Sequence, residues 1–169
     1  MKAQGIVLAL VLAVPAAAGY AAAGKVSHQD KLWLTGAHQV NLAEIKAGKT
    51  ASGKGNSAIV RKTGRMLVSD HKMLDSALKR AARELGVSLP HSPSKAQQQL
   101  LQKIGSKSGA QFDKMWTKKM AAAHLRAINK TEFEINHSQS EKVKKLAKKA
   151  LPALQVHLNM LKHAQNKLK

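Results

Sequence analysis

The chain of 169 residues contains no cysteine. Without thiols it can form neither disulfides nor thiolate metal sites, and it cannot use a cysteine nucleophile. Aromatic residues make up only 3% of the chain, and proline occurs four times. Alanine, leucine, lysine and glutamine dominate instead, and no stretch alternates apolar and β-branched residues as a strand does. The composition therefore predicts an all-α protein.

Acidic residues are also scarce: 9 Asp and Glu stand against 29 Lys and Arg, which gives a formal net charge of +20. A chain with this balance is attracted to polyanions. Nucleic acid is one candidate, and the anionic polymers and lipids of a bacterial envelope are another. The alternative interpretation is a well-solvated surface with a basic bias and no dedicated partner.

Long apolar runs are missing as well, since the longest is the nine-residue stretch Ile6–Val14. It is too short to span a bilayer as a helix. It follows Lys2 and precedes two runs of alanine, so residues 1–23 predict a secretory signal with cleavage after Ala18 or Ala23. An uncleaved amphipathic anchor is the alternative. We expect residues 24–169 to form an exported domain that is periplasmic, secreted or envelope-associated.

What the chain does contain is helical periodicity. One stripe with alternating spacings of four and three consists of Val60, Gly64, Leu67, His71, Leu74, Leu78, Ala81 and Leu85. A second stripe consists of Val143, Ala147, Ala150, Leu154, His157, Leu161, Ala164 and Leu168. Such spacing is typical of the buried face of an α-helix, and each stripe is interrupted by one histidine.

These patterns predict four long helices over residues 29–52, 58–85, 110–138 and from 141 to the C-terminus. Ser57 and Ser140 are the expected N-caps of the second and fourth helices, and Gly86 ends the second. The connection over residues 88–109 is unusually long and is expected to hold a short helix over 95–104. The predicted architecture is a ferritin-like four-helix bundle in which this connection crosses the bundle.

Several short stretches carry a family resemblance. They are Asn41-Leu42-Ala43-Glu44-Ile45, Met66-Leu67-Val68-Ser69-Asp70-His71, Leu85-Gly86-Val87-Ser88-Leu89-Pro90, Gln111-Phe112-Asp113, Ala123-His124, Leu151-Pro152-Ala153-Leu154 and His157-Leu158. In this order the set resembles an exported bacterial family of unknown function that is often labelled as outer-membrane proteins. The resemblance covers about residues 30–164. It implies a ferritin-like helical bundle in an exported protein, and it implies no particular activity.

Each predicted long helix carries one histidine on or near its inner stripe. These residues are His38, His71, His124 and His157. With turns near Gly55 and Gln139, the two histidines of each hairpin lie at similar depth, because a helix rises about 1.5 Å per residue. If the long connection crosses the bundle, the second and third helices are parallel. We then expect both turns at one end and all four histidines in one layer, roughly 25 Å from that end.

A layer of imidazoles predicts a transition-metal site, with zinc, iron or copper as the candidate ions. Glu44 is the only carboxylate well inside the first helix and is added as a candidate ligand. The alternative is a set of buried histidines that hydrogen-bond one another, Thr131, Asn41 or water. We expect Asp70 to hold a histidine or lysine of a neighbouring helix, or else to face Arg65 or Lys72 at the surface.

The sequence gives little support for other kinds of active or binding site. A ferritin-type di-iron centre needs Glu-x-x-His motifs on two helices, and only Glu134-Ile135-Asn136-His137 matches. No serine-hydrolase, phosphate-binding or dinucleotide-binding motif is present. Few aromatics are available to stack on bases, and the excess charge is mostly lysine, so we do not expect nucleic acid as the partner.

The leading hypothesis is an exported, non-enzymatic, envelope-associated or stress-related module that binds an anionic envelope polymer or lipid surface. The lysines expected to make this contact lie on the last helix: Lys142, Lys144, Lys145, Lys148 and Lys149. The second hypothesis, of a different class, is a metal-binding bundle with possible redox chemistry that uses the histidine layer and Glu44.

Overall fold

The computed structural model describes residues 26–169, which form four long helices and one short one. The helices are α1 (His28–Lys54), α2 (Ala58–Glu84), α3 (Lys95–Gly105), α4 (Gly109–His137) and α5 (Glu141–Lys167). Each long helix agrees with its predicted range to within a few residues. The predicted signal segment lies outside the described residues. Within those residues, no helix is both long and apolar enough to cross a membrane.

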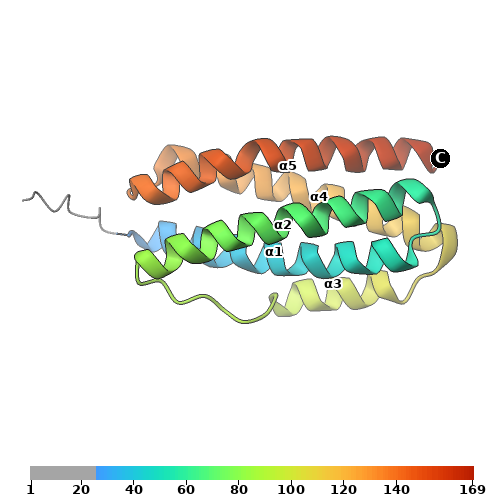
Figure 1. Ribbon diagram of the computed structural model, residues 1–169, viewed down its shortest axis with the longest axis horizontal. Coiled ribbons are helices and arrows are strands. Elements are labelled where there is room, and N and C mark those ends of the chain that lie inside the picture. The colour runs from blue at the N-terminus through green and yellow to red at the C-terminus, as the bar shows by residue number, and fades with distance from the viewer. Residues whose placement is uncertain (1–25) are drawn as a thin grey trace, which may run out of the picture.

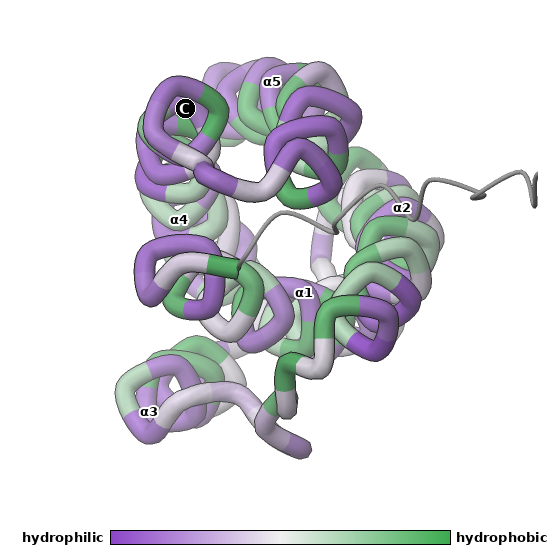
Figure 2. The backbone as a smooth tube through the Cα atoms, turned by 90° about the vertical axis from the view of Figure 1, so that its left-hand side faces the viewer, coloured by the Kyte–Doolittle hydropathy of each residue, from purple (hydrophilic) through white to green (hydrophobic). Residues whose placement is uncertain are grey.

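The four long helices occupy the corners of a bundle when it is viewed along its axis (Figure 2). Neighbouring corners are α1 with α2, α2 with α5, α5 with α4, and α4 with α1. The short helix α3 lies outside this square and packs against α1 and α4. The predictions of an all-α bundle and of a long crossover that contains a short helix are therefore confirmed.

The crossover makes α2 and α4 parallel, as expected, but the predicted position of the turns is wrong. The α1–α2 turn lies at the same end as the C-terminus, and the α4–α5 turn lies at the opposite end (Figure 1). The reason is geometric: a turn precedes α2 but follows α4, so two parallel helices place these turns at opposite ends. Histidines still reach one level because His71, His124 and His157 each lie near the middle of a helix.

Side-chain caps fix most helix starts. Ser27 and Ser94 each form a reciprocal capping box with the residue three positions later, and the Ser140 hydroxyl accepts a bond from the Val143 amide. Ser57 occupies the N-cap position of α2, but its side chain makes no capping bond. The Asp113 carboxylate of α4 instead accepts from the amides of Asn56 and Ser57, at 2.9 and 2.7 Å. The two hairpins are thus joined by a cap that comes from another helix.

Helices α1 and α2 approach each other at Gly48 and Gly64. A Cβ atom built on Gly64 would lie 2.8 Å from the Gly48 carbonyl oxygen and 2.9 Å from the Ala51 Cβ. A Cβ on Gly48 would lie 2.7 Å from the Gly64 carbonyl oxygen. Because these neighbours are mostly backbone atoms, they cannot turn aside as a flexible side chain could. Glycine at both positions therefore sets the distance between the two helices.

The buried core continues beside this contact. The Trp116 side chain is fully buried, and its indole N–H donates a 3.0 Å bond to the Ala47 carbonyl. Phe112, Leu67 and Leu161 pack in the same apolar cluster. A smaller cluster around Trp33, Leu34 and Leu78 includes residues of α5 near the other end. The central histidines lie on helices that carry apolar residues on both sides of them.

We predict that Gly64→Ala will lower the free energy of unfolding by about 1–3 kcal/mol, because the added methyl group forces α1 and α2 apart. Gly36→Ala is the matched control, because a Cβ there meets nothing within 4 Å. This control should be neutral or gain up to about 1 kcal/mol from higher helix propensity. Chemical denaturation of both variants measures the difference, and equal stabilities would contradict the tight contact.

Candidate metal centre

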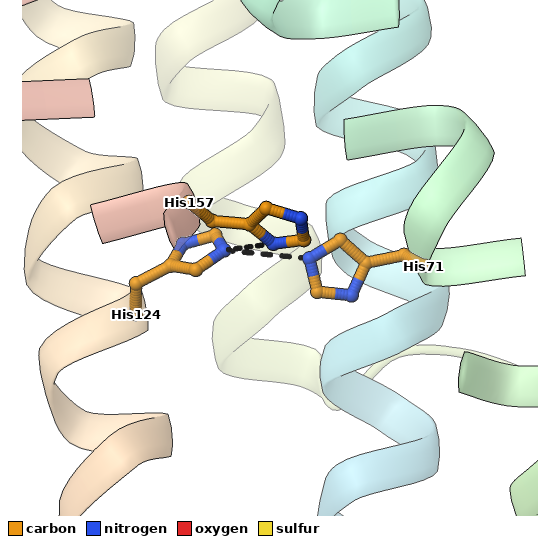
Figure 3. A group of neighbouring side chains, drawn as sticks. All are labelled: His71, His124 and His157. Carbon is orange, nitrogen blue, oxygen red and sulfur yellow. Dashed lines mark hydrogen bonds between the residues drawn. The ribbon is translucent and has the colours of Figure 1, made fainter. Parts of the chain in front are cut away.

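Three of the four predicted histidines meet in the centre of the bundle (Figure 3). His71 comes from α2, His124 from α4 and His157 from α5, and none is more than 1% exposed. One ring nitrogen of each lies within 4.8 Å of the other two. The Nε2 atom of His124 is 3.4 Å from Nε2 of His71 and 3.3 Å from Nδ1 of His157.

The outer ring nitrogens of these histidines all face acceptors. Nδ1 of His124 lies 3.0 Å from the Met120 carbonyl oxygen, and Nε2 of His157 lies 3.0 Å from the Asp70 carboxylate. Nδ1 of His71 lies 2.9 Å from the side-chain oxygen of Asn41. A carbonyl or carboxylate oxygen can only accept, so in each neutral ring the outer nitrogen carries the proton.

The three inner nitrogens are consequently left with lone pairs that converge. In this tautomeric state none of them can donate a hydrogen bond to another, so the short distances between them are contacts of acceptors. Two nitrogens bound tetrahedrally to one zinc ion at 2.0–2.1 Å stand about 3.3–3.4 Å apart. The separations from His124, 3.4 and 3.3 Å, match that geometry. The third separation, between His71 and His157, is within 4.8 Å, and the three nitrogens together could hold a metal ion.

Burial keeps the three imidazoles neutral. It lowers the pKa of His71 well below the usual 6.5, that of His124 to about 4, and that of His157 as well, although the Asp70 carboxylate works against the last shift. Neutral imidazole is the form that coordinates metals. The bundle therefore presents the binding form of all three side chains at neutral pH.

Glu44 does not join the three nitrogens, in contrast to its prediction as a ligand. Its Oε1 lies 3.6 Å from Nδ1 of His124, which is the outer nitrogen of that ring. Its Oε2 is buried and has no hydrogen-bond partner within residues 26–169, and burial raises its pKa to about 8. Glu44 thus lies beside the outer nitrogen of His124, while the hydrogen bond of that nitrogen goes to the Met120 carbonyl.

His38 also stands outside the cluster, so the prediction of a four-histidine layer is wrong for this residue. Its Nδ1 lies 2.6 Å from the Asp75 carboxylate, and its Nε2 lies 2.9 Å from the Pro90 carbonyl oxygen. Asp75 comes one helical turn after His71, so His38 meets α2 one turn beyond the cluster. Both of its ring nitrogens are engaged, and the residue joins α1, α2 and the start of the crossover.

Asp70 contacts a histidine of a neighbouring helix, which is one of the two partners expected for it. Asn41, expected as a structural partner, contacts His71. Thr131 makes no such contact with a histidine of the described chain. The isolated Glu-x-x-His motif stays at the end of α4, where His137 is exposed and stacks on Phe133. It therefore adds no ligand to the central cluster.

The lysines predicted for polyanion binding lie on α5, and two of the five are paired. Lys142 pairs with Glu84, and Lys144 lies 3.2 Å from Glu141.

A second basic surface, which sequence reasoning missed, is a groove between α3 and α4. Its lining consists of Lys103, Lys107, Gln111, Lys114, Met115, Lys118 and Lys119. The spacing of lysines on α4 was visible in the sequence, but their meeting with α3 depends on the fold.

Comparison with known protein families identifies the family of this chain. A family model described as a domain of unknown function, DUF4142, matches residues 15–164. The chain belongs to this family. The matched range contains all three clustered histidines, and the resemblance inferred from the short stretches is confirmed.

A solved structure resembles this DUF4142 chain in fold. It is described as the crystal structure of a DUF305 fragment from Deinococcus radiodurans, with a TM-score of 0.74 and 9% sequence identity. The match covers 84% of this chain and 98% of that one. At this identity the likeness concerns the bundle fold alone. Comparison with curated proteins gives no match.

The shifted pKa values predict how the stability of the metal-free protein depends on pH. The unfolded chain protonates its histidines near pH 6.5, whereas the buried cluster resists protonation to lower pH. Stability from these residues is therefore complete above about pH 6.5 and is lost as pH falls, by up to about 1.4 kcal/mol per pH unit for each proton. Glu44 acts in the opposite direction between pH 4.5 and about 8.

With three histidines against the two carboxyl groups whose pKa values burial raises, Glu44 and Glu134, we predict a net fall in unfolding free energy from pH 6.5 to pH 5. Denaturation at a series of pH values measures it. His71→Leu removes one of the three groups and should flatten the profile, although the Asn41 oxygen that accepts from His71 is then left without its donor. An unchanged profile in this variant would show that the cluster does not control the acid response.

Proposed function

We propose that this DUF4142 bundle binds one divalent transition-metal ion through Nε2 of His71, Nε2 of His124 and Nδ1 of His157. The observation that carries the proposal is the convergence of three lone pairs whose outer N–H groups are all committed to acceptors. A buried group of acceptors without a donor is unfavourable. A cation at the point where they meet would supply the missing partner.

The surroundings of the three rings support the same proposal. Ligating histidines usually donate their second nitrogen to a carboxylate, an amide or a backbone carbonyl, and these partners fix the ring orientation. Asp70, Asn41 and the Met120 carbonyl fill these roles, with Glu44 close behind His124. Three protein ligands leave room for a fourth ligand from solution. Zinc, copper and iron are the ions to test, because imidazole suits each of them.

We predict that the purified protein, dialysed separately against zinc, copper and iron salts and then against buffer, will retain about one ion per chain of at least one metal. His71→Ala should abolish this retention, because it removes one of three ligands. His38→Gln is the matched control, since His38 is also a buried histidine but lies outside the cluster. Elemental analysis gives the metal content of each variant.

A second test changes a hydrogen-bond partner of one proposed ligand, the Asp70 carboxylate that contacts His157. Asp70→Asn keeps the shape of the side chain and should weaken metal binding about 10–100-fold, which is the usual effect of an outer-shell change. Circular dichroism checks that each variant remains folded. Loss of metal in His38→Gln as well as in His71→Ala, or retention in neither variant nor wild type, would contradict the three-histidine site.

A second candidate function is binding to an anionic lipid surface of the bacterial envelope. The observation that favours it is the α3–α4 groove, whose lining holds five lysines and no carboxylate in the described chain. On α5, by contrast, Lys142 and Lys144 are paired with glutamates. A surface of unpaired lysines gains up to about 1 kcal/mol per residue against anionic lipid at low salt. We therefore rank the α3–α4 groove above the α5 surface as the contact.

We predict that the triple change Lys114→Gln, Lys118→Gln and Lys119→Gln will weaken binding to phosphatidylglycerol vesicles at low salt. Co-sedimentation measures the bound fraction, and added salt should reduce the difference by screening. The metal content should not change, because these residues lie outside the histidine cluster.

The triple change Lys145→Gln, Lys148→Gln and Lys149→Gln tests the α5 surface and should have the smaller effect. A control that carries the same loss of charge on α1 and α2, with Lys46, Lys49 and Lys62 changed to glutamine, separates a local contact from net charge. Equal losses in all three variants would mean that only the overall charge matters.

A further inference from the structure

A cavity of about 260 Å³ lies between α1 and its neighbours, beside the histidine cluster but not part of it. Its walls are mostly apolar and include Trp33, Leu74, Leu78 and Leu154. The exposed residues Leu32 and Lys130 also line it, so the cavity reaches the surface of the bundle. For comparison, an apolar cavity of about 150 Å³ is large enough to hold a benzene molecule.

Six polar or charged side chains line this space, and two of them, Asn41 and Thr131, are buried. They are 6% and 4% exposed, so both groups are more than nine-tenths buried. The Asn41 side-chain oxygen accepts a hydrogen bond from His71. The two N–H groups of the Asn41 amide remain available to donate to a ligand. Within residues 26–169, neither that amide nor the Thr131 hydroxyl donates a hydrogen bond to another protein group. Unpartnered polar groups at the wall of an apolar cavity are typical of a ligand site, where they fix orientation.

We propose that this cavity binds a small neutral molecule with an apolar body and one hydroxyl or carbonyl group. The apolar body would pack against Trp33 and the leucines, and its polar group would bond to Asn41 and Thr131. A cationic ligand fits less well, because the one charged side chain in the lining is Lys130. The inference goes beyond metal binding and does not depend on it, since none of the three metal ligands lines the cavity.

Gly36 provides a direct test. It lines the cavity, and a Cβ there would meet nothing within 4 Å, so a larger side chain can enter without a backbone clash. Gly36→Leu should therefore fill the space and leave the bundle folded. Gly53→Leu is the matched control, because Gly53 is in the same helix, has equally open space around its Cβ and does not line the cavity.

The experiment uses p-cresol as the probe and metal-free protein prepared with a chelator. Calorimetric titration gives the affinity, and the amide signals of Asn41 in an NMR spectrum report the location. We expect saturable binding by the wild type and by Gly53→Leu, with loss of at least about tenfold in affinity in Gly36→Leu. Thr131→Val, which keeps the shape and removes the hydroxyl, should weaken binding about 2–10-fold.

Toluene serves as the second probe, because it has the shape of p-cresol without the hydroxyl. It should bind about 2–10-fold more weakly than p-cresol if the polar groups act as proposed. Absence of saturable p-cresol binding, or equal affinity in Gly36→Leu and wild type, would overturn the site. Equal affinity for toluene and p-cresol would overturn the role of Asn41 and Thr131. Because metal is absent throughout, none of these results depends on the histidine cluster as a metal site.

Discussion

The central constraint on this bundle is the direction of three imidazole lone pairs. The outer N–H groups of His71, His124 and His157 are each held by an acceptor, so the inner nitrogens face one another without a proton between them. Burial disfavours protonation, which would be one way to relieve this arrangement. The metal ion proposed above would be another way. Without an ion, burying three acceptors that face one another costs free energy. The apolar packing on either side of the cluster must offset this cost for the protein to fold.

The topology explains why three helices can supply these side chains. The crossover through α3 carries the chain back along the bundle, so α4 starts beside the start of α2 and runs parallel to it (Figure 1). Residues near the middle of such helices lie at one level whichever end the turns occupy. The glycine contact between α1 and α2 and the Asp113 cap between the hairpins then fix the relative positions of the helices that carry the three histidines and their hydrogen-bond partners.

Periodicity was sufficient to predict the helices and to find the three clustered histidines, because a histidine on a regular apolar stripe is directed into the core. It could not distinguish His38, since a stripe defines a face but not which neighbouring side chain a residue meets. The reason is that the His38 ring hydrogen-bonds to Asp75, which lies one helical turn beyond His71 on α2. The sequence did suggest Asn41 and Asp70 as partners of histidines, but not which histidine each contacts, and it did not indicate the lysine groove that joins α3 to α4. Such pairings depend on the angles between helices, which sequence spacing does not encode.

The carboxylates around the cluster complete the electrostatic argument. Three neutral imidazoles do not offset the charge of a dication, and the protein already carries a net charge of +20. Asp70 touches His157, and Glu44 lies behind His124 with one oxygen unpartnered in the described chain. Burial raises the pKa of Glu44 to about 8, although the charge of Arg126 works against this shift, so the carboxyl group is mostly neutral at pH 7. Next to a metal-bound histidine, the same group would lie where negative charge is most favourable. The proposed ion would therefore favour the ionised form of Glu44, which burial alone disfavours.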